Sequence, residues 1–218
     1  MVKYLLHCIL TLIYPDRYTC LICNQYSLNN CICRECNKKL EIINQDFRMK
    51  SGNESYRCFS VFKYSGEVTD IIKKLKYGNK FSLVPFLGEY MTELIRSKNI
   101  DFDIITFVPM TSRRKKHRGF NQAQLLAEEV GKRINKPVDK ILKKEKNTKD
   151  QIGLNDEERW KNVSKCFQLN GNVDVKDKVI LLIDDVITTG ATTINCGEIL
   201  KKHGAKEIYI LTVAKSIV

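Results

Sequence analysis

The feature that most constrains this chain is an uninterrupted run of five apolar residues at 179–183, which leads into two aspartates. Such a run is typical of a central parallel strand, which is buried on both faces of its sheet. A helix is expected at 191–202, and the pair His203-Gly204 is expected to end it. With another strand expected at 208–213, the order strand, helix, strand predicts a right-handed crossover in an α/β sheet.

The segment between this strand and helix has the chemistry of a sugar-phosphate site. The string Thr-Thr-Gly-Ala-Thr at 188–192 falls at the expected helix start, where free backbone N–H groups and the helix dipole attract phosphate. Gly190 lets the backbone approach that phosphate closely. Asp184 and Asp185 would repel it unless they bound something else, and a ribose diol offers two O–H donors to carboxylates. The segment 179–193 therefore predicts a 5-phosphoribose site, whose carboxylates also suit magnesium.

A second candidate segment follows the short strand expected at 104–108. Pro109 comes next, and the six residues at 113–118 are all basic. A basic loop between a strand and a helix suits pyrophosphate, because Arg forks match phosphate oxygens and Lys adds a point charge. A leaving pyrophosphate also needs its growing negative charge stabilised. We therefore expect Arg113 and Arg118 to contact the ligand and the residues between them to be largely solvated.

Each of these segments also has a simpler interpretation. Asp184 and Asp185 would then cap a helix, and the threonines would fill a turn. The basic residues would form a solvated turn or a patch for the nucleic-acid backbone. The chain has 37 Lys and Arg against 25 Asp and Glu, a net charge of +12. This balance favours anionic partners, or it reflects a Lys-rich surface that aids solubility.

Five of the nine cysteines lie within seventeen residues of one another near the N-terminus. Clustering at ligand spacing indicates metal rather than an extracellular disulfide framework. The pairs Cys20-x-x-Cys23 and Cys33-x-x-Cys36 predict a tetrahedral zinc site of four thiolates, which has no open position and is therefore structural. Cys31 either substitutes for Cys33 or stays free. The alternative for the whole cluster is reduced cysteines without metal.

The chain is expected to divide into an N-terminal module at 1–50 and a main domain at 56–218. The module holds the cysteines and an apolar stretch at 4–14, which is too short for a bilayer span of ~20 residues and has no cleavage site after it. We expect that stretch to be a helix that packs on the protein, with no membrane span and a cytoplasmic location. A polar linker is expected at 49–55, and a charged hood or flap is expected at 143–168.

Apolar spacing predicts the other elements of the main domain. A strand is expected at 58–64, and helical spacing recurs at 68–75, 83–96 and 122–134. The length of 218 residues suits one main domain with a small appendage.

Taken in order along nearly the whole chain, these motifs resemble the ComF family of competence-associated, phosphoribosyltransferase-like proteins. The resemblance begins at the segment that contains Cys20, Cys23, Cys33 and Cys36, called here the cysteine knuckle, and it ends in the loop at 184–192. Between them lie Tyr64-Ser65-Gly66, Ile72-Lys73-Lys74-Leu75-Lys76-Tyr77, Val108-Pro109 with Arg113, Arg118-Gly119-Phe120-Asn121-Gln122, Gln151-x-Gly153-Leu154, Arg159 and Asn162.

The resemblance implies a type I phosphoribosyltransferase fold, with a parallel sheet flanked by helices and a small N-terminal zinc-binding module of four cysteines. The aspartates would hold the ribose hydroxyls, the threonine loop the 5-phosphate, and the region 108–118 the pyrophosphate, while 151–162 arches over the site. The implied residues are, for catalysis, Asp184, Asp185, Arg113 and Arg118; for substrate binding, Lys76, Val108, Pro109, Asp184, Asp185, Val186, Thr188, Thr189, Gly190, Ala191 and Thr192; and for zinc, Cys20, Cys23, Cys33 and Cys36.

The resemblance favours Mg-dependent transfer of phosphoribose from phosphoribosyl pyrophosphate to an unknown acceptor, in competence, DNA uptake and transformation. The alternative is a non-catalytic competence factor that binds this ligand together with single-stranded DNA, a competence helicase or other DNA-processing partners. A third is a regulator of nucleotide metabolism that uses the loop as a sensor. Only Phe120, Trp160 and Phe167 lie near the basic segments, so DNA binding rests mainly on the resemblance.

Overall fold

The structure, a computed structural model, describes residues 19–27, 31–43, 45–144, 166–171 and 173–216. Its helices are α2 (Arg34–Lys38), α3 (Gly66–Tyr77), α4 (Leu83–Ser97), α5 (Ser112–Arg118), α6 (Gln122–Ile134) and α8 (Ala191–Lys202). Its strands are β1 (Phe47–Ser51), β2 (Glu54–Lys63), β3 (Ile104–Phe107), β4 (Leu142–Lys144), β5 (Phe167–Leu169), β6 (Val179–Ile187) and β7 (Glu207–Lys215).

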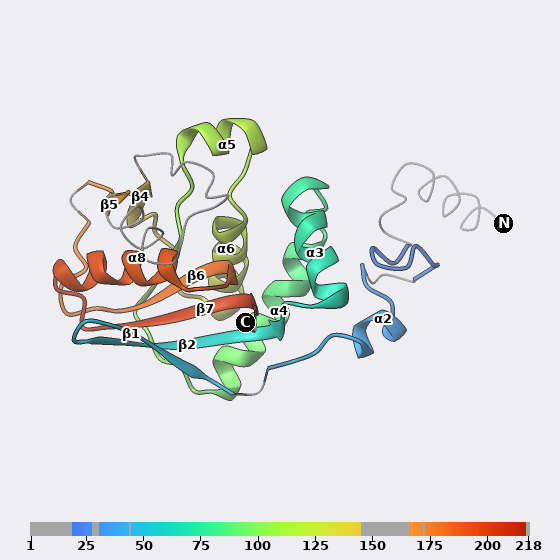
Figure 1. The fold of residues 1–218 in the computed structure, drawn as a ribbon, viewed down its shortest axis with the longest axis horizontal. Coiled ribbons are helices and arrows are strands. Elements are labelled where there is room, and N and C mark those ends of the chain that lie inside the picture. Colours follow the sequence, from blue (N-terminus) through green and yellow to red (C-terminus); the bar gives the residue numbers. More distant parts are fainter. Residues whose placement is uncertain (1–18, 28–30, 44, 145–165, 172, 217–218) are drawn as a thin grey trace.

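The centre of the fold is a five-stranded sheet with the strand order β1-β2-β7-β6-β3 (Figure 1). β2, β7, β6 and β3 run parallel, and β1 pairs antiparallel with β2 at one edge. α8 supplies the crossover from β6 to β7 that the sequence predicted. The register pairs Phe107 with Ile183, so the carboxyl ends of β3 and β6 lie side by side. The two segments singled out in the sequence therefore leave the sheet at the same edge.

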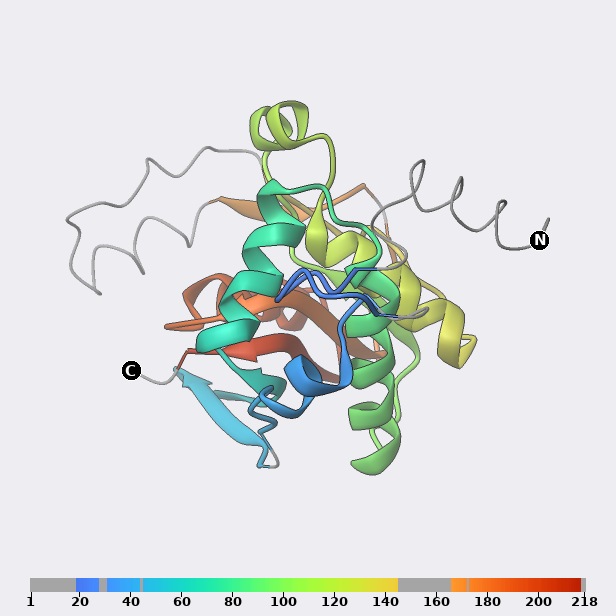
Figure 2. The same ribbon diagram turned by 90° about the vertical axis from the view of Figure 1, so that its right-hand side faces the viewer.

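The sheet separates two hydrophobic cores, because successive side chains of a strand point to opposite faces. Leu181 and Ile183 of β6 belong to the core formed with α3, α4 and α6. Ile180 and Leu182 belong to the other core, which they share with α8, β4 and β5. Figure 2 shows this layered arrangement, with α4 and α6 on one side of the sheet and α8 on the other. Burial on both faces explains the uninterrupted apolar run at 179–183.

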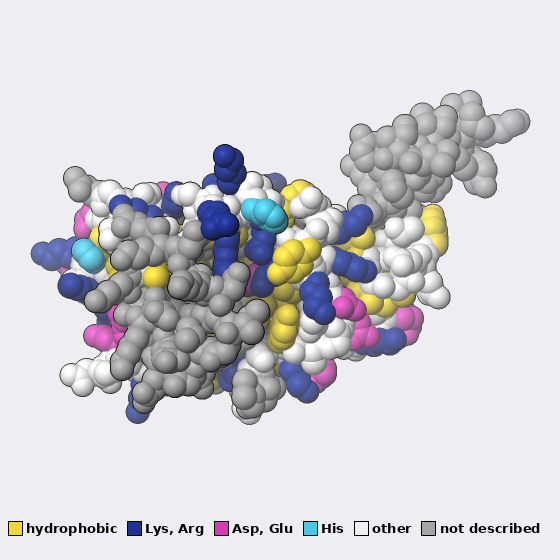
Figure 3. Space-filling view, turned by 45° about the horizontal axis from the view of Figure 1, so that its top comes forward, with side chains coloured by type: hydrophobic (Ala, Val, Ile, Leu, Met, Phe, Trp, Pro, Cys, Tyr) yellow, Lys and Arg dark blue, Asp and Glu magenta, His cyan; other side chains and the backbone are white. Residues whose placement is uncertain are grey.

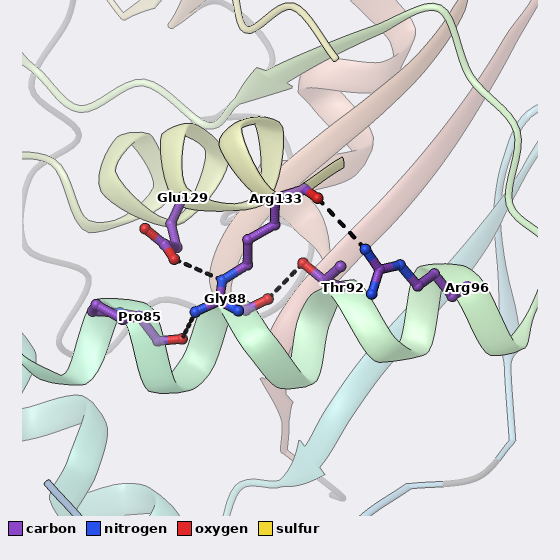
Figure 4. Close-up of polar contacts among 6 residues, drawn as sticks. All are labelled: Pro85, Gly88, Thr92, Arg96, Glu129 and Arg133. Carbon is purple, nitrogen blue, oxygen red and sulfur yellow. Dashed lines mark hydrogen bonds and ion pairs between the residues drawn. The ribbon is translucent and has the colours of Figure 1, made fainter. Parts of the chain in front are cut away.

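α6 is held against α4 by a close contact at Gly88 (Figure 4). A Cβ atom at this position would collide with Cγ of Glu129, so the helices approach this closely only with glycine there. Glu129 accepts a hydrogen bond from Nε of Arg133 at 2.6 Å, and Arg133 also donates to the carbonyl oxygen of Pro85 at 3.0 Å. This packing orients α6, whose first residues border the cavity described below.

Two structural expectations from the sequence are wrong. The linker expected at 49–55 is a hairpin, in which β1 and β2 pair from Phe47 with Cys58 to Ser51 with Glu54. The basic loop expected at 113–118 is the helix α5, because Thr111 caps its start by accepting the N–H of Arg114 and Gly119 ends it at a φ of 86°.

The other predicted helices and strands are present, with small differences in their ends. β6 continues to Ile187 and so includes both aspartates, which the sequence placed after the strand. Of the hood expected at 143–168, the structure describes only its two ends, which belong to the antiparallel pair β4 and β5. The apolar stretch at 4–14 lies outside the described residues. Within the part of the chain that is described, no helix has both the length and the apolar character needed to cross a membrane.

Candidate functional site

A cavity of about 300 Å³ opens at the carboxyl ends of β3 and β6. Its walls come from the end of α3, the segment after β3, α5, the start of α6, β4, β6 and α8. The lining residues are Lys76, Tyr77, Val108, Pro109, Met110, Thr111, Arg114, Arg118, Asn121, Gln122, Ala123, Lys144, Asp184, Asp185 and Thr192. The structure thus brings residues predicted from three separate parts of the sequence into one cavity.

The two aspartates of β6 form the acidic side of this cavity. Oδ1 of Asp184 accepts a hydrogen bond from the backbone N–H of Asp185 at 2.9 Å, and the Asp185 carboxylate pairs with Nζ of Lys76 at 2.9 Å. Burial, followed by the charge of Asp185, raises the pKa of Asp184 to about 8. Burial acts to lower the pKa of Lys76, but the negative charges of Asp185 and Asp184 have a larger opposite effect, so the pKa of Lys76 is raised. Hydroxyl donors or a cation would relieve the cost of charging Asp184.

The loop that follows β6 forms a smaller hollow of about 60 Å³ beside Asp184. Gly190 has a φ of 78°, a left-handed conformation that suits glycine, and a Cβ atom there would collide with the sulfur of Met49. The first N–H groups of α8 have no acceptors within the helix, and apart from that of Ala191, which donates to Oγ1 of Thr189 at 3.5 Å, they are available to an anion. The predicted residues that line this hollow are Val186, Thr188, Thr189, Gly190, Ala191 and Thr192.

The helical form of α5 determines which basic residues face the cavity. Arg114 and Arg118 are four residues apart and so lie on one face of the helix, and both line the cavity. Arg113 is exposed and is not among the lining residues, so its ligand role stays a prediction. Arg118 donates from Nη1 to Oε1 of Gln122 at 2.9 Å, and its guanidinium lies 5.3 Å from the centre of the Tyr77 ring.

Several lining residues were missed by the sequence reasoning. Lys144 reaches the cavity from β4 and lies 4.8 Å from the ring centre of Phe167, and burial lowers its pKa. Nothing in the sequence distinguishes it from the neighbouring Lys143. Asn121 donates to the carbonyl oxygen of Val108 at 3.0 Å and caps α6 by accepting the N–H of Ala123. Its position before an apolar helical pattern is a recognisable capping signal.

The cysteine knuckle lies apart from this cavity and has the geometry of a metal site. The Sγ atoms of Cys20, Cys23, Cys33 and Cys36 all lie within 4.8 Å of one another, and those of Cys23 and Cys33 are 3.8 Å apart. A tetrahedral zinc ion with bonds of about 2.3 Å requires sulfur atoms about 3.8 Å apart. Cys31 is not in this group, so the geometry favours Cys33 as the third ligand.

Some residues that carry the predicted site lie outside the described part of the chain. They are Gln151, Gly153, Leu154, Arg159, Trp160 and Asn162, all from the expected hood. Their proposed roles are therefore not assessed by the structure.

Residues 88–217 match the phosphoribosyl transferase domain family, and the chain belongs to this family. The fold class predicted from the sequence, a type I phosphoribosyltransferase fold with a small N-terminal module of four clustered cysteines, is confirmed. Among solved structures, the chain is similar to the allosteric regulatory enzyme of purine biosynthesis, with 21% sequence identity and a TM-score of 0.42. The match covers 61% of this chain and 25% of the enzyme's chain.

Curated relatives confirm the resemblance to the ComF family. Competence protein F of Haemophilus influenzae is 28% identical over 160 residues, which cover 70% of each chain. Competence protein ComFC of Streptococcus pneumoniae is 24% identical over 211 residues, covering 86% of this chain and 89% of its own. DNA utilization protein YhgH of Escherichia coli is 24% identical over 167 residues, which cover 74% of this chain and 73% of the relative.

Proposed function

We propose that this protein binds phosphoribosyl pyrophosphate with Mg²⁺ and transfers the phosphoribosyl group to an acceptor. The observation that carries the proposal is the common location of three chemically distinct surfaces. A carboxylate pair, a hollow at the start of α8 and a set of cationic side chains adjoin at one edge of the sheet. These surfaces suit, respectively, ribose hydroxyls, a 5-phosphate and a pyrophosphate.

In this transfer the acceptor's nucleophile bonds to C1 of the ribose while the bond from C1 to the pyrophosphate oxygen breaks. The pyrophosphate leaves with the electron pair, and the proton of the acceptor passes to solvent. Arg114, Arg118 and Lys76 stabilise the charge that grows on the leaving oxygens. Asp184 and Asp185 orient the sugar, and their carboxylate oxygens are the ligands that would hold Mg²⁺, which would supply positive charge to offset that of the leaving group.

The names of the relatives extend this proposal to a biological process. Two of them are competence proteins and a third is a DNA utilization protein. We propose that this protein acts in competence and DNA uptake in the cytoplasm, beside DNA-processing partners. We also propose that the segment before β1, which holds the four clustered cysteines, forms a zinc module, and that the chain from β1 onward, with its hood, forms the catalytic domain.

The proposal is tested by calorimetric titration of phosphoribosyl pyrophosphate with Mg²⁺. Replacing both carboxylates, as in Asp184→Asn/Asp185→Asn, is expected to weaken binding by about 100-fold, because hydrogen bonds to charged groups contribute about 1.5–3 kcal/mol each. The variant Asp70→Asn, an exposed aspartate on α3, is expected to bind like the wild type. Wild-type affinity in the double variant would rule out this site. Binding without pyrophosphate release across a broad panel of acceptors would leave a ligand-binding factor instead of a transferase.

A second candidate function, binding of single-stranded nucleic acid, is favoured by a surface that the sequence did not reveal. Tyr77 and Phe81 are exposed, at 74% and 47%, although large aromatic side chains are usually buried. Tyr77 faces the Arg118 guanidinium, and the ring centres of Phe81 and Phe120 are 4.8 Å apart. We call these four residues the aromatic–basic patch. Figure 3 shows hydrophobic side chains beside Lys and Arg on one face of the molecule. Such surfaces let bases stack while cations contact phosphates.

Tyr77→Ala/Phe81→Ala is expected to weaken binding of a single-stranded oligonucleotide by about 10-fold or more, since each stacked base contributes about 1–3 kcal/mol. Fluorescence anisotropy at several salt concentrations measures this loss. Tyr26→Ala removes another exposed aromatic, 60% accessible in the cysteine module, and is expected to have no effect. If the wild type does not bind the oligonucleotide even at low salt, this second function is excluded.

A further inference from the structure

One buried side chain at the cavity has a donor that the fold leaves unused. Gln122 is only 2% exposed, and its Nε2 has no hydrogen-bond partner among the residues that the structure describes. A buried polar group without a partner costs about 1–3 kcal/mol. Gln122 also borders the 300 Å³ cavity, so an occupant of that cavity can supply the missing acceptor.

The orientation of this amide follows from its neighbour. Oε1 of Gln122 accepts a hydrogen bond from Nη1 of Arg118 at 2.9 Å. A guanidinium only donates, so the atom that faces Arg118 must be the amide oxygen and the remaining group must be the NH₂. The Arg118 guanidinium also lies 5.3 Å from the centre of the Tyr77 ring. Nε2 is therefore the donor of this amide that has no partner, while the amide oxygen is already in use.

The chemistry of the surrounding wall indicates what this donor meets. Among the residues that line the cavity, the charged side chains of Arg114, Arg118 and Lys144 can only donate hydrogen bonds. The start of α6 adds the positive end of the helix dipole beside Gln122. The carboxylates of Asp184 and Asp185 come from β6. A wall of donors matches a group that is rich in acceptor oxygens and negatively charged.

We propose that Gln122 is a specificity-determining residue that donates from Nε2 to an oxygen of the diphosphate group of the ligand. The assignment rests on the proposed function, because the diphosphate is the part of phosphoribosyl pyrophosphate that remains once the ribose and 5-phosphate are assigned. Arg118 contributes charge and orients the amide, and Gln122 contributes a directed neutral donor. Together they distinguish a diphosphate-bearing ligand from ribose 5-phosphate, which lacks that group.

The test compares three probes, each with Mg²⁺, by calorimetry: phosphoribosyl pyrophosphate, inorganic pyrophosphate and ribose 5-phosphate. Gln122→Met keeps the side-chain length and removes the donor. This variant is expected to bind phosphoribosyl pyrophosphate and inorganic pyrophosphate about 10-fold or more weakly, because a donor to a charged group is removed. Its affinity for ribose 5-phosphate is expected to be unchanged. Gln124→Met is the matched control, because Gln124 lies on the same helix and donates to Glu128 at 2.8 Å.

A second variant separates the donor from the effect on Arg118. Gln122→Glu keeps an acceptor for Arg118 but replaces the donor with a carboxylate, and it is expected to lose at least as much diphosphate affinity as Gln122→Met. Retained affinity in Gln122→Glu would show that the residue acts through Arg118 and would overturn the assignment. If wild type and Gln122→Met bind phosphoribosyl pyrophosphate equally, only the assignment fails. If the wild type binds none of the probes, the proposed function fails with it.

Discussion

Replacing Cys36 with serine is expected to abolish zinc binding and to unfold the knuckle within residues 19–43. The four Sγ atoms lie within 4.8 Å of one another in an arrangement that suits one tetrahedral ion. Binding of a structural zinc ion contributes about 10–16 kcal/mol of apparent free energy in small zinc modules, which is far more than so short a segment can gain from its own core. Zinc content, measured by mass spectrometry, is expected to fall from about one ion per chain to nearly none.

The loss is expected to spread to the surface on which the knuckle packs. Leu21, Ile32 and Leu40 belong to the core that also contains α3 and α4, and Oδ1 of Asn37 accepts a hydrogen bond from the Tyr90 hydroxyl at 2.9 Å. Hydrogen exchange is expected to show lost protection in the knuckle while β6 and β7 remain protected. Cys31→Ser is the control and is expected to keep its zinc. Full zinc content in Cys36→Ser, or its loss in Cys31→Ser, would contradict the assignment of these ligands.

Asp184→Asn is expected to make the ligand-free protein more stable at pH 8 by about 2–4 kcal/mol. Burial and the neighbouring Asp185 raise the pKa of Asp184 from 3.8 to about 8, although Lys76 and Lys144 partly oppose this. Each unit of pKa shift corresponds to about 1.4 kcal/mol, and solvent screening of the partly accessible Asp184 carboxyl makes the effect on stability smaller than the full shift would give. An amide avoids the cost of a buried charge, and its oxygen can still accept the N–H of Asp185.

The sign of the pH dependence follows from the raised pKa. A carboxyl whose pKa is higher in the folded state keeps its full contribution to stability below the unfolded pKa, near 4, and loses it as the pH rises through the folded value. The free energy of unfolding of the wild type is therefore expected to fall relative to Asp184→Asn between pH 4 and pH 8. Urea unfolding across this range measures the difference. Asp70→Asn controls for the loss of one carboxylate, and parallel curves for wild type and Asp184→Asn would contradict the prediction.

Most elements were predictable because their signals lie within a few neighbouring residues. The helices expected at 122–134 and 191–202 match α6 and α8, since apolar spacing coincides with a cap at Asn121 and with the turn at Gly190. The failures have physical causes. β1 is an edge strand whose residues are exposed or half-buried, so its sequence is as polar as a linker. In α5 all residues after Ser112 are basic, and a helix without an apolar face shows no periodicity.

The sequence by itself predicted the class of ligand and determined the chemistry of the candidate binding groups. Two adjacent carboxylates, a Thr-Gly-rich helix start and paired cysteines have their chemistry whatever surrounds them. Tertiary structure decided the ion pair between Lys76 and Asp185 and the presence of Arg114 and Lys144, but not Arg113, among the cavity-lining residues. It also decided that Nε2 of Gln122 has no partner among the described residues. Each of them is set by the distance between side chains that are far apart in the chain or by the direction in which a helix points them. Such distances arise only when the sheet and its helices pack, and local sequence patterns do not contain them.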